Sequence, residues 1–394
     1  MRVWGEPDEG ALSQAIRCNT FGDVFATALM ADHHKGYSQP IGGVVAYRGL
    51  ISPSGVGYDI GCGCCAVRTD IKADDIRLGM SKIMDEVFSR VSFGIGQKNP
   101  HPVDHPLFDD LTWQIDQNIR SLKKMAYEQL GTVGSGNHYV DILADETGTV
   151  WIGVHFGSRG FGYKIASGFL NLAAGRAFDA KAPGESMDQL PVLLSLDTEL
   201  GQAYIACMKL AGRYAYAGRS YVVAKVLDIL GTQSSFEVHN HHNFAWGEEH
   251  AGERVVVVRK GATPNRPGQI SFVGGSMGDI SVIIRGKDTE ENRAALYSTM
   301  HGAGRVMSRT KAAGKFNWKT KTCSGGVVVW DAVRADLRNR GIELRGAGAD
   351  EAPEVYKNLR SVLAAHAETV EVLHTLTPLG VAMAGGNEYD PYAD

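Results

Sequence analysis

Short polar patches set in glycine are the most informative feature of this sequence. Metal-ligand side chains occur in several of them: Asp59 and Cys62 in GVGYDIGCGCC, His138 in GSGNHYVD, His155 in VHFGSRG, and the histidines of VHNHHNF. Two patches, HFGSRG and HGAGRVMSR, also carry arginines, whose guanidinium groups suit phosphate. Carboxylate, thiolate and imidazole ligands beside arginines indicate metal-assisted phosphate chemistry.

The loop GVGYDIGCGCC places a carboxylate and a thiol three residues apart. In a tight glycine turn, Asp59 and Cys62 can face one cation, and a thiolate can bridge two cations. Taken alone, the loop fits equally well a buried cysteine-rich turn that Asp59 caps.

Two strand-like runs, HYVDILA and VWIGVH, flank the turn residues ADETGT and predict an antiparallel hairpin. With the turn centred between Glu146 and Thr147, His138 pairs directly with His155. Directly opposed residues share a face, with Cβ atoms roughly 4.5–5.5 Å apart. Two imidazoles meeting at one end of a sheet favour metal over a purely structural loop.

The run HNHHN follows a probable strand, TQSSFEV. Because residues alternate between the two faces of a strand, only part of this run can face a metal. Spacing does not distinguish His242 from His241, and a flexible histidine-rich surface loop is the usual alternative for such a run.

The segment HGAGRVMSR is expected within a helix or at its start. His301, Arg305 and Arg309 then fall at i, i+4 and i+8 along one stripe. An imidazole followed by two guanidinium groups suits a nucleophile that attacks phosphorus while the arginines neutralise oxygen charge. A basic helical face with a satisfied histidine is the alternative.

Two further segments carry weaker signals. In ADHHKGYSQPIGG, Asp32 could orient a catalytic imidazole and raise its basicity, or could simply form a turn. The segment RKGATPNRPGQISFVGGSMGDIS could wrap a phosphate or a base with Lys260, Arg266, Ser276 and Ser281. The sequence has neither a GxxxxGK[ST] loop nor a Rossmann fingerprint, so a nucleotide would be held by an uncommon arrangement.

The composition bounds the class of protein. With 394 residues and 44% hydrophobic content the chain can bury a large core, and we expect one catalytic domain over residues 1–394, because the ligand-bearing patches span most of its length. The formal net charge of -4 gives no overall attraction to nucleic acid, so a polyanion must meet a local basic patch.

Neither a signal peptide nor a membrane span is evident, and adjacent cysteines make a poor disulfide framework, so a reduced, cytoplasmic location is expected. Mixed strands and helices predict an α+β fold with central sheets surrounded by helices. Strands are expected at 42–50, 254–259 and 279–285. Helices are expected at 77–91, 106–129, 164–181, 198–229 and 352–372.

Taken in order, these segments resemble the RtcB family of RNA ligases. The matching motifs are DHHKGYSQPIGG, GVGYDIGCG, GSGNH, HFGSRG, HHN, RKGAT, GSMG, HGAGRVMSR and DEAPEVYK. The resemblance implies two manganese ions, GTP, and ligation of an RNA 3'-phosphate or 2',3'-cyclic phosphate end to a 5'-hydroxyl end, in RNA repair or tRNA splicing. Family members can need an accessory activating protein.

Carried over by position, the resemblance assigns roles to individual residues. His301 would be the guanylylated nucleophile, oriented by Asp32. Cys62 would bridge the metals, held also by Asp59, His138, His155 and His242. Phosphates would meet Arg159, Arg305 and Arg309. The nucleotide would be held by Asn137, Asp141, Ser276, Ser281, Gly302, Ala303, Gly304 and Tyr356.

The chain departs from the family pattern at two places. Asp141 stands where the family usually has a glutamate that grips the guanine edge, and the hairpin register above puts it on the face opposite His138. Ala384, followed by an acidic tail, stands where a lysine is expected. Losing a polar partner to a base edge costs roughly 1–3 kcal/mol, enough to relax guanine preference.

Three functions compete at this point. The first is a nucleotidyl-transferring RNA ligase acting through His301. The second is a binuclear-metal phosphohydrolase, or an enzyme that adds a nucleotide cap to nucleic-acid 3'-phosphate ends. The third is a non-catalytic RNA-binding or ribosome-associated protein in which the ligand set is structural. The arginines near His301 favour the first over the second, and the complete ligand set argues against the third.

Overall fold

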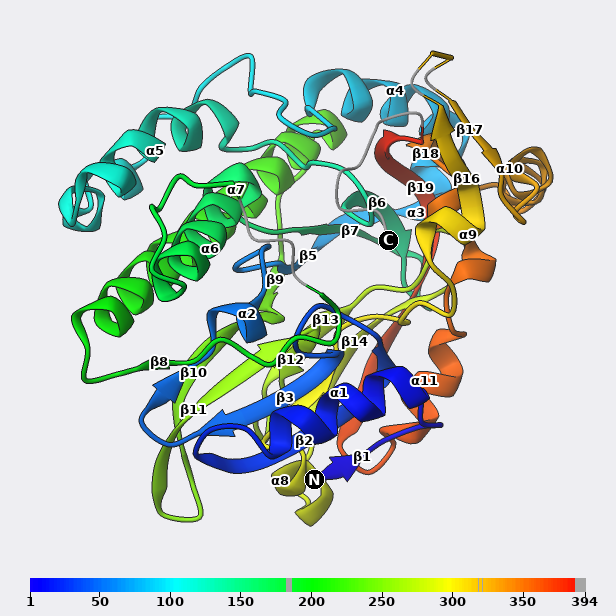
Figure 1. Ribbon diagram of the computed structural model, residues 1–394. Coiled ribbons are helices and arrows are strands. Elements are labelled where there is room, and N and C mark those ends of the chain that lie inside the picture. The colour runs from blue at the N-terminus through cyan, green and yellow to red at the C-terminus, as the bar shows by residue number, and fades with distance from the viewer. Residues whose placement is uncertain (182–185, 318, 321, 387–394) are drawn as a thin grey trace.

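Two large β-sheets form the framework of the molecule, with helices packed around them (Figure 1). The computed structural model describes residues 1–181, 186–317, 319–320 and 322–386. The acidic tail noted above begins beyond Gly386 and lies outside the described residues. The mixture of mainly antiparallel sheets and surrounding helices confirms the predicted α+β class.

The larger sheet has the strand order β13-β14-β19-β6-β7-β5-β9, and β18 also pairs with β19. Its neighbours are antiparallel except β18 and β19. In sequence order its strands are β5 (Gly63–Lys72), β6 (Tyr139–Ala144), β7 (Thr149–Phe156), β9 (Phe236–His241), β13 (Ile270–Val273), β14 (Ser281–Gly286), β18 (Glu343–Ala347) and β19 (Val370–Gly385).

The smaller sheet has the order β1-β2-β3-β11-β10. Its strands are β1 (Arg2–Val3), β2 (Val24–His34), β3 (Ile41–Tyr47), β10 (Asn243–His250) and β11 (Glu253–Lys260). Three two-stranded ladders add β4 (Leu50–Ile51) with β8 (Leu194–Ser195), β12 (Ala262–Pro264) with β15 (Ser298–Met300), and β16 (Gly314–Asn317) with β17 (Thr322–Gly325).

The helices lie on the outside of both sheets (Figure 1). They are α1 (Glu9–Asn19), α2 (Pro53–Val56), α3 (Ala73–Ile76), α4 (Met80–Arg90), α5 (Gln117–Gln129), α6 (Arg159–Ala173), α7 (Glu199–Leu230), α8 (Glu290–Ala294), α9 (Arg309–Ala313), α10 (Trp330–Asn339) and α11 (Leu359–Ala365). Short 3₁₀ turns cover Arg77–Gly79, Pro106–Asp109, Leu111–Gln114, Ala349–Glu351 and Pro353–Val355. Among the described helices, none has both the length and the apolar character that a membrane crossing requires.

The long helix α7 confirms the helix predicted at 198–229. The Thr198 side chain accepts the Gly201 N–H and caps its start, and Gly231, with φ 65°, ends it in the left-handed conformation. Helix α7 packs against β5 and β7, α6 packs against α7, and α5 against α6 (Figure 1). Its buried residues include Tyr214, which belongs to one hydrophobic core cluster, and Val222, which belongs to another.

Several helix predictions were wrong in extent. The predicted helix at 106–129 is broken into two 3₁₀ turns before α5, where Asp110 and Asp116 cap new starts with their side chains. The helix placed at 164–181 begins at Arg159 and ends at Ala173. The C-terminal helix at 352–372 shrinks to α11, because the chain then enters β19.

The predicted strands agree more closely with the structure than the predicted helices do. The strand expected at 254–259 is β11, and the one expected at 279–285 overlaps β14. The strand expected at 42–50 corresponds to β3, which ends at Tyr47 before the short β4. Helix α4 occupies the later part of the helix expected at 77–91.

The predicted hairpin exists, but its register was wrong by one residue. Tyr139, not His138, pairs with His155, and the turn centres on Thr147. The Asp145 side chain fixes this turn by accepting the N–H groups of Thr147 and Thr149. The shift places Asp141 on the same face as His155, contrary to the predicted orientation.

Candidate metal centre and active site

The predicted metal ligands converge where β5, β7 and β9 meet. A Cβ atom at Gly63 would lie 2.1 Å from the Asn240 carbonyl oxygen, so glycine is what allows β9 to approach the start of β5. The same approach lets the His242 N–H donate to the Cys62 carbonyl at 2.8 Å. Side chains 180 residues apart in sequence therefore become neighbours.

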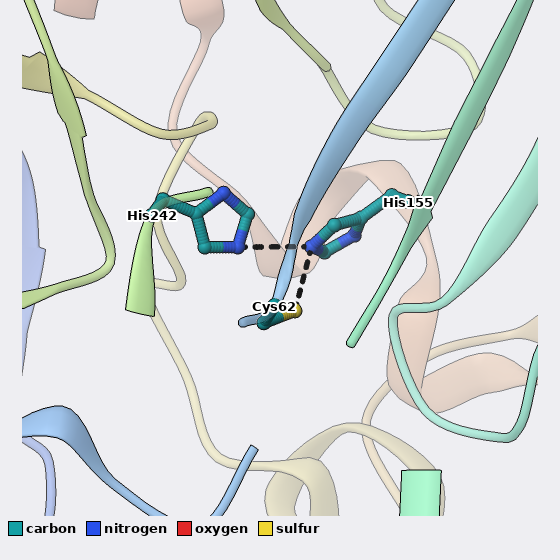
Figure 2. A group of neighbouring side chains, drawn as sticks. All are labelled: Cys62, His155 and His242. Atoms are coloured by element: carbon teal, nitrogen blue, oxygen red, sulfur yellow. Dashed lines mark hydrogen bonds between the residues drawn. The ribbon is translucent and has the colours of Figure 1, made fainter. Parts of the chain in front are cut away.

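Cys62, His155 and His242 form the first group of potential ligands (Figure 2). Cys62 Sγ lies 3.3 Å from His155 Nε2, which lies 3.2 Å from His242 Nε2. All three side chains are buried. Thiol and imidazole donors at this separation suit one divalent transition metal.

Asp59, Cys62 and His138 form the second group. His138 Nε2 lies 3.0 Å from Asp59 Oδ2 and 3.6 Å from Cys62 Sγ. Because Cys62 belongs to both groups, its sulfur can bridge two cations. Together we call these five residues the ligand cluster: Asp59, Cys62, His138, His155 and His242.

The buried imidazoles are held neutral, which leaves nitrogen lone pairs for a cation. Burial, and then the neighbouring His138, lower the pKa of His155 to about 3. Burial lowers the pKa of His242 well below its usual value. The Nδ1 atom of His155 lies 3.0 Å from the Asn137 carbonyl, which fixes the ring so that Nε2 faces the cluster.

The pKa values of the two acidic members of the ligand cluster, Asp59 and Cys62, are shifted in opposite directions. Burial acts to raise the pKa of Asp59, but the His138 contact outweighs it and the pKa falls to about 2. Burial and the Asp59 charge raise the pKa of the Cys62 thiol. A coordinated cation would reverse this, because a metal-bound thiol is deprotonated.

Two histidines of the run HNHHN, which spacing alone could not tell apart, have different surroundings in the structure. His242 joins the ligand cluster, whereas His241 Nδ1 lies 2.9 Å from the Gly61 carbonyl and 3.0 Å from Arg219 Nη2. The structure thus brings His242 into the cluster, in agreement with the choice that the resemblance implied.

Asp32 and His301 form a carboxylate–imidazole pair next to the ligand cluster. His301 Nδ1 lies 2.6 Å from Asp32 Oδ2, and the same carboxylate accepts the His301 N–H at 2.8 Å. The His301 ring centroid lies 4.8 Å from that of His242. Burial acts to raise the Asp32 pKa, but contact with His301 lowers it to about 2, so this carboxylate is ionised.

The helical stripe predicted for HGAGRVMSR is absent. Residues 301–308 form an irregular loop, and α9 begins only at Arg309, after the Ser308 cap. A Cβ atom at Gly304, whose φ is +78°, would lie 2.0 Å from the Asp32 carbonyl oxygen. The loop therefore follows the β2 backbone closely, which brings His301 to Asp32 and excludes a helix.

Arg305 of this loop and Arg309 at the start of α9 are held by carboxylates. We call the surface that they form the arginine wall: Arg305, Arg309, Asp350, Glu351 and Tyr356. Arg305 Nη1 lies 3.5 Å from Glu351 Oε2 and donates to the Tyr356 hydroxyl at 3.2 Å. Arg309 lies 2.7 Å from Asp350 and also contacts Glu351. A phosphate bound here would compete with these existing ion pairs for the guanidinium groups.

One cavity of 920 Å³ brings together the ligand cluster, His301 and most of the predicted nucleotide-binding residues. The residues that line it include Asn137, Asp141, Arg159, Ser276, Gly302, Ala303, Gly304, Arg305, Arg309 and Tyr356. Ser281 does not line this cavity. Its hydroxyl accepts the Gly275 N–H at 3.2 Å, so it supports the loop that carries Ser276.

Asp141 reaches the cavity wall, because the corrected register turns it toward His155. Its Oδ1 is buried without a hydrogen-bond partner among the described residues. Burial raises its pKa well above the usual value. Ala384 is buried in β19 and is not among the cavity-lining residues, whereas Val381 and Met383 of the same strand are.

Sequence reasoning missed several supporting residues. Lys357 donates to the carbonyls of Ala31 and His33, on either side of Asp32, at 2.9 Å each. Asp350 and Glu351 lie in a quoted motif but were given no role. Arg219 lies within the apolar stripe of α7, and a charged residue in such a stripe is the signal that could have revealed it.

Comparison with known proteins places this chain in one family by two kinds of match, a family model and individual relatives. The model of the family described as tRNA-splicing ligase RtcB matches residues 14–125 and 111–384. The chain is 34% identical to RNA-splicing ligase RtcB of Escherichia coli (strain K12), over 95% of each chain. It is 31% identical to tRNA-splicing ligase RtcB of Thermococcus kodakarensis, over 94% of this chain and 90% of that protein.

Proposed function

This chain belongs to the RtcB family, and we propose on that basis that it is an RNA ligase that acts in RNA splicing or repair. We further propose that it joins 3'-phosphate or 2',3'-cyclic phosphate ends to 5'-hydroxyl ends with GTP as a substrate. The observation that carries the proposal is the position of His301, which contacts Asp32 and lies next to His242 of the ligand cluster.

His301 would be the nucleophile. Asp32 holds Nδ1, so the lone pair of Nε2 is left to attack the α-phosphorus of GTP. A nitrogen–phosphorus bond forms, the bond from that phosphorus to the β-phosphate oxygen breaks, and pyrophosphate leaves. The ionised Asp32 stabilises the positive charge that develops on the imidazole.

The remaining steps would use the same cavity. The RNA 3'-phosphate, formed by hydrolysis where the end is cyclic, displaces His301 from the GMP. The 5'-hydroxyl then attacks the activated 3'-phosphate and GMP leaves, with Arg159, Arg305 and Arg309 available to neutralise phosphate charge.

The ligand cluster would hold the two manganese ions, with Cys62, His155 and His242 as ligands of one and Asp59, Cys62 and His138 as ligands of the other. Thiolate, imidazole and carboxylate donors are compatible with a divalent transition metal, and the neutral imidazoles need lose no proton to bind. When bound, the cations would act as Lewis acids that offset charge on phosphate oxygens.

A covalent adduct tests the proposal. We expect the protein, incubated with manganese and radiolabelled GTP, to retain an acid-labile label, and His301→Ala to retain none. His374→Ala is the control, because His374 lies on the surface of β19 and contacts Glu146, away from the cavity. Retained label in His301→Ala would reject this nucleophile. Absence of any adduct, with metal-dependent phosphoesterase activity present, would favour a phosphohydrolase.

A further inference from the structure

The guanidinium of Arg219 connects three separate segments of the chain. Arg219 is fully buried on α7. Its Nη1 donates to the Gly61 carbonyl at 2.9 Å and to the Phe156 carbonyl at 2.6 Å. Its Nη2 lies 3.0 Å from His241 Nδ1, and its Nε donates to His239 Nε2 at 2.8 Å.

Three of these contacts fall on residues adjacent in sequence to members of one potential cation site. Gly61 precedes Cys62, Phe156 follows His155, and His241 precedes His242. These are the three side chains shown in Figure 2. A rigid, planar group bonded to each neighbouring residue constrains the backbone from which all three ligands project.

The buried positive charge of Arg219 also lacks a carboxylate partner among the described residues. No carboxylate in that part of the chain forms a salt bridge with it, and the ionisable groups that interact with it, besides His239 and His241, include Tyr216 and the thiols of Cys62, Cys64 and Cys65. Burying a cation without an anionic partner is costly.

Arg259 provides a useful contrast. It is also fully buried, but it lies in β11 and its Nη1 donates to the carboxylate of Glu248 at 2.6 Å. It contacts no residue adjacent to Cys62, His155 or His242 in the described part of the chain. Arg259 thus has the burial of Arg219 without its connection to the ligand cluster.

We propose that Arg219 is the positioning residue of the cation site formed by Cys62, His155 and His242. Its effect on the site formed by Asp59, Cys62 and His138 is much smaller, because Cys62 is the one ligand of that site that adjoins an Arg219 contact. The inference rests on the proposed function, since it assumes that both sites bind cations. According to this inference, α7 contributes no ligand but holds the ligands of the Cys62, His155 and His242 site in position.

The experiment measures Mn²⁺ binding by calorimetry at each site separately. His138→Ala leaves the Cys62, His155 and His242 site, and His242→Ala leaves the other. Adding Arg219→Lys to the first background should weaken Mn²⁺ binding about 10- to 100-fold, the usual effect of losing an outer contact to metal ligands. Adding it to the second background should change binding much less.

Arg259→Lys, in the same two backgrounds, is the control for loss of a buried arginine. We expect it to lower thermal stability without weakening either site. A general structural role for Arg219 would weaken both sites equally, and that result would overturn the inference, as would unchanged Mn²⁺ binding at both. A wild-type protein that binds two Mn²⁺ ions leaves the proposed function standing in either case.

Should Arg219→Lys fail to fold, His241→Gln provides the second variant. It removes one contact of the guanidinium and leaves Arg219 in place. It must still weaken the Cys62, His155 and His242 site selectively, and a folded His241→Gln with unchanged binding would overturn the inference. A wild-type protein that binds no divalent cation would overturn both this inference and the proposed cation sites.

Discussion

The ligand cluster and the arginine wall line the same cavity but are built in different ways. The cluster projects from the ends of paired strands, and its donor atoms already lie within 4.8 Å of one another in each group. The arginine wall stands on an irregular loop, α9 and 3₁₀ turns, and its guanidinium groups are held by Asp350 and Glu351.

The difference indicates two modes of ligand binding. A cation bound by Cys62, His155 and His242 would meet side chains that the pairing of β5, β7 and β9 already holds close together. A phosphate at the arginine wall must compete with carboxylates for the same guanidinium groups. We therefore expect substitutions in the ligand cluster to abolish cation binding. Substitutions in the arginine wall should change the affinity for phosphate without abolishing it.

The largest effect is expected at Cys62, the one residue shared by both cation groups. Cys62→Ala should lower Mn²⁺ affinity at both sites by more than about 100-fold, because loss of a ligand exceeds the effect of losing an outer contact. Titration calorimetry measures this. Cys207→Ala, another buried cysteine that does not line the cavity, is the matched control and should bind normally. Loss at one site only would contradict a shared ligand.

The next largest effect is expected on the rate of adduct formation when Asp32, which links the smaller sheet to the His301 loop, is replaced. Asp32→Asn should slow adduct formation about 100-fold, since an amide can stabilise neither the required tautomer nor the developing charge. Single-turnover labelling with GTP measures the rate, and Mn²⁺ affinity should stay unchanged. Equal rates for the variant and the wild type would show that the Asp32 contact is only structural.

The same pair has a defined pH dependence. Because the Asp32 pKa is lowered from 3.8 to about 2, the stabilising effect of this carboxylate is fully present above about pH 4. It is lost as the pH falls toward 2, where the folded protein also takes up the proton.

A smaller effect is expected from Glu351→Gln in the arginine wall. Removing a buried charged partner of Arg305 and Arg309 should lower the free energy of unfolding by about 1–3 kcal/mol without nucleotide. With saturating GTP the loss should shrink, because phosphates replace the carboxylate. Thermal melts with and without GTP compare the two states. An equal loss in both would show that the nucleotide does not use these arginines.

The smallest effect is expected from Asp141→Glu. The longer carboxylate should reach a base edge better and raise the preference for GTP over ATP about fivefold, the contribution of about one net hydrogen bond. In the wild type, burial raises the pKa of Asp141, so its ability to accept base N–H groups should increase as the pH rises through that raised pKa. Competition labelling with both nucleotides measures the ratio. An unchanged ratio would place Asp141 outside base recognition.

The sequence alone identified the chemical groups of the site. Asp59, Cys62, His138 and His155 were found because ligand-type side chains stood in glycine-rich segments, and α7 was found from apolar spacing over 32 residues. These signals are local, since a turn or a long helix is specified by neighbouring residues. Motif order, which also needs no coordinates, indicated the family.

Only the tertiary structure decided how these groups meet. The one-residue register shift turned Asp141 into the cavity, and the pairing of β5 with β9 brought His242, not His241, to Cys62. Close approach of the Gly304 loop to β2 replaced a predicted helix, and packing of α7 placed Arg219 beside three ligand segments. Such outcomes depend on contacts between residues far apart in sequence, which periodicity and composition do not encode.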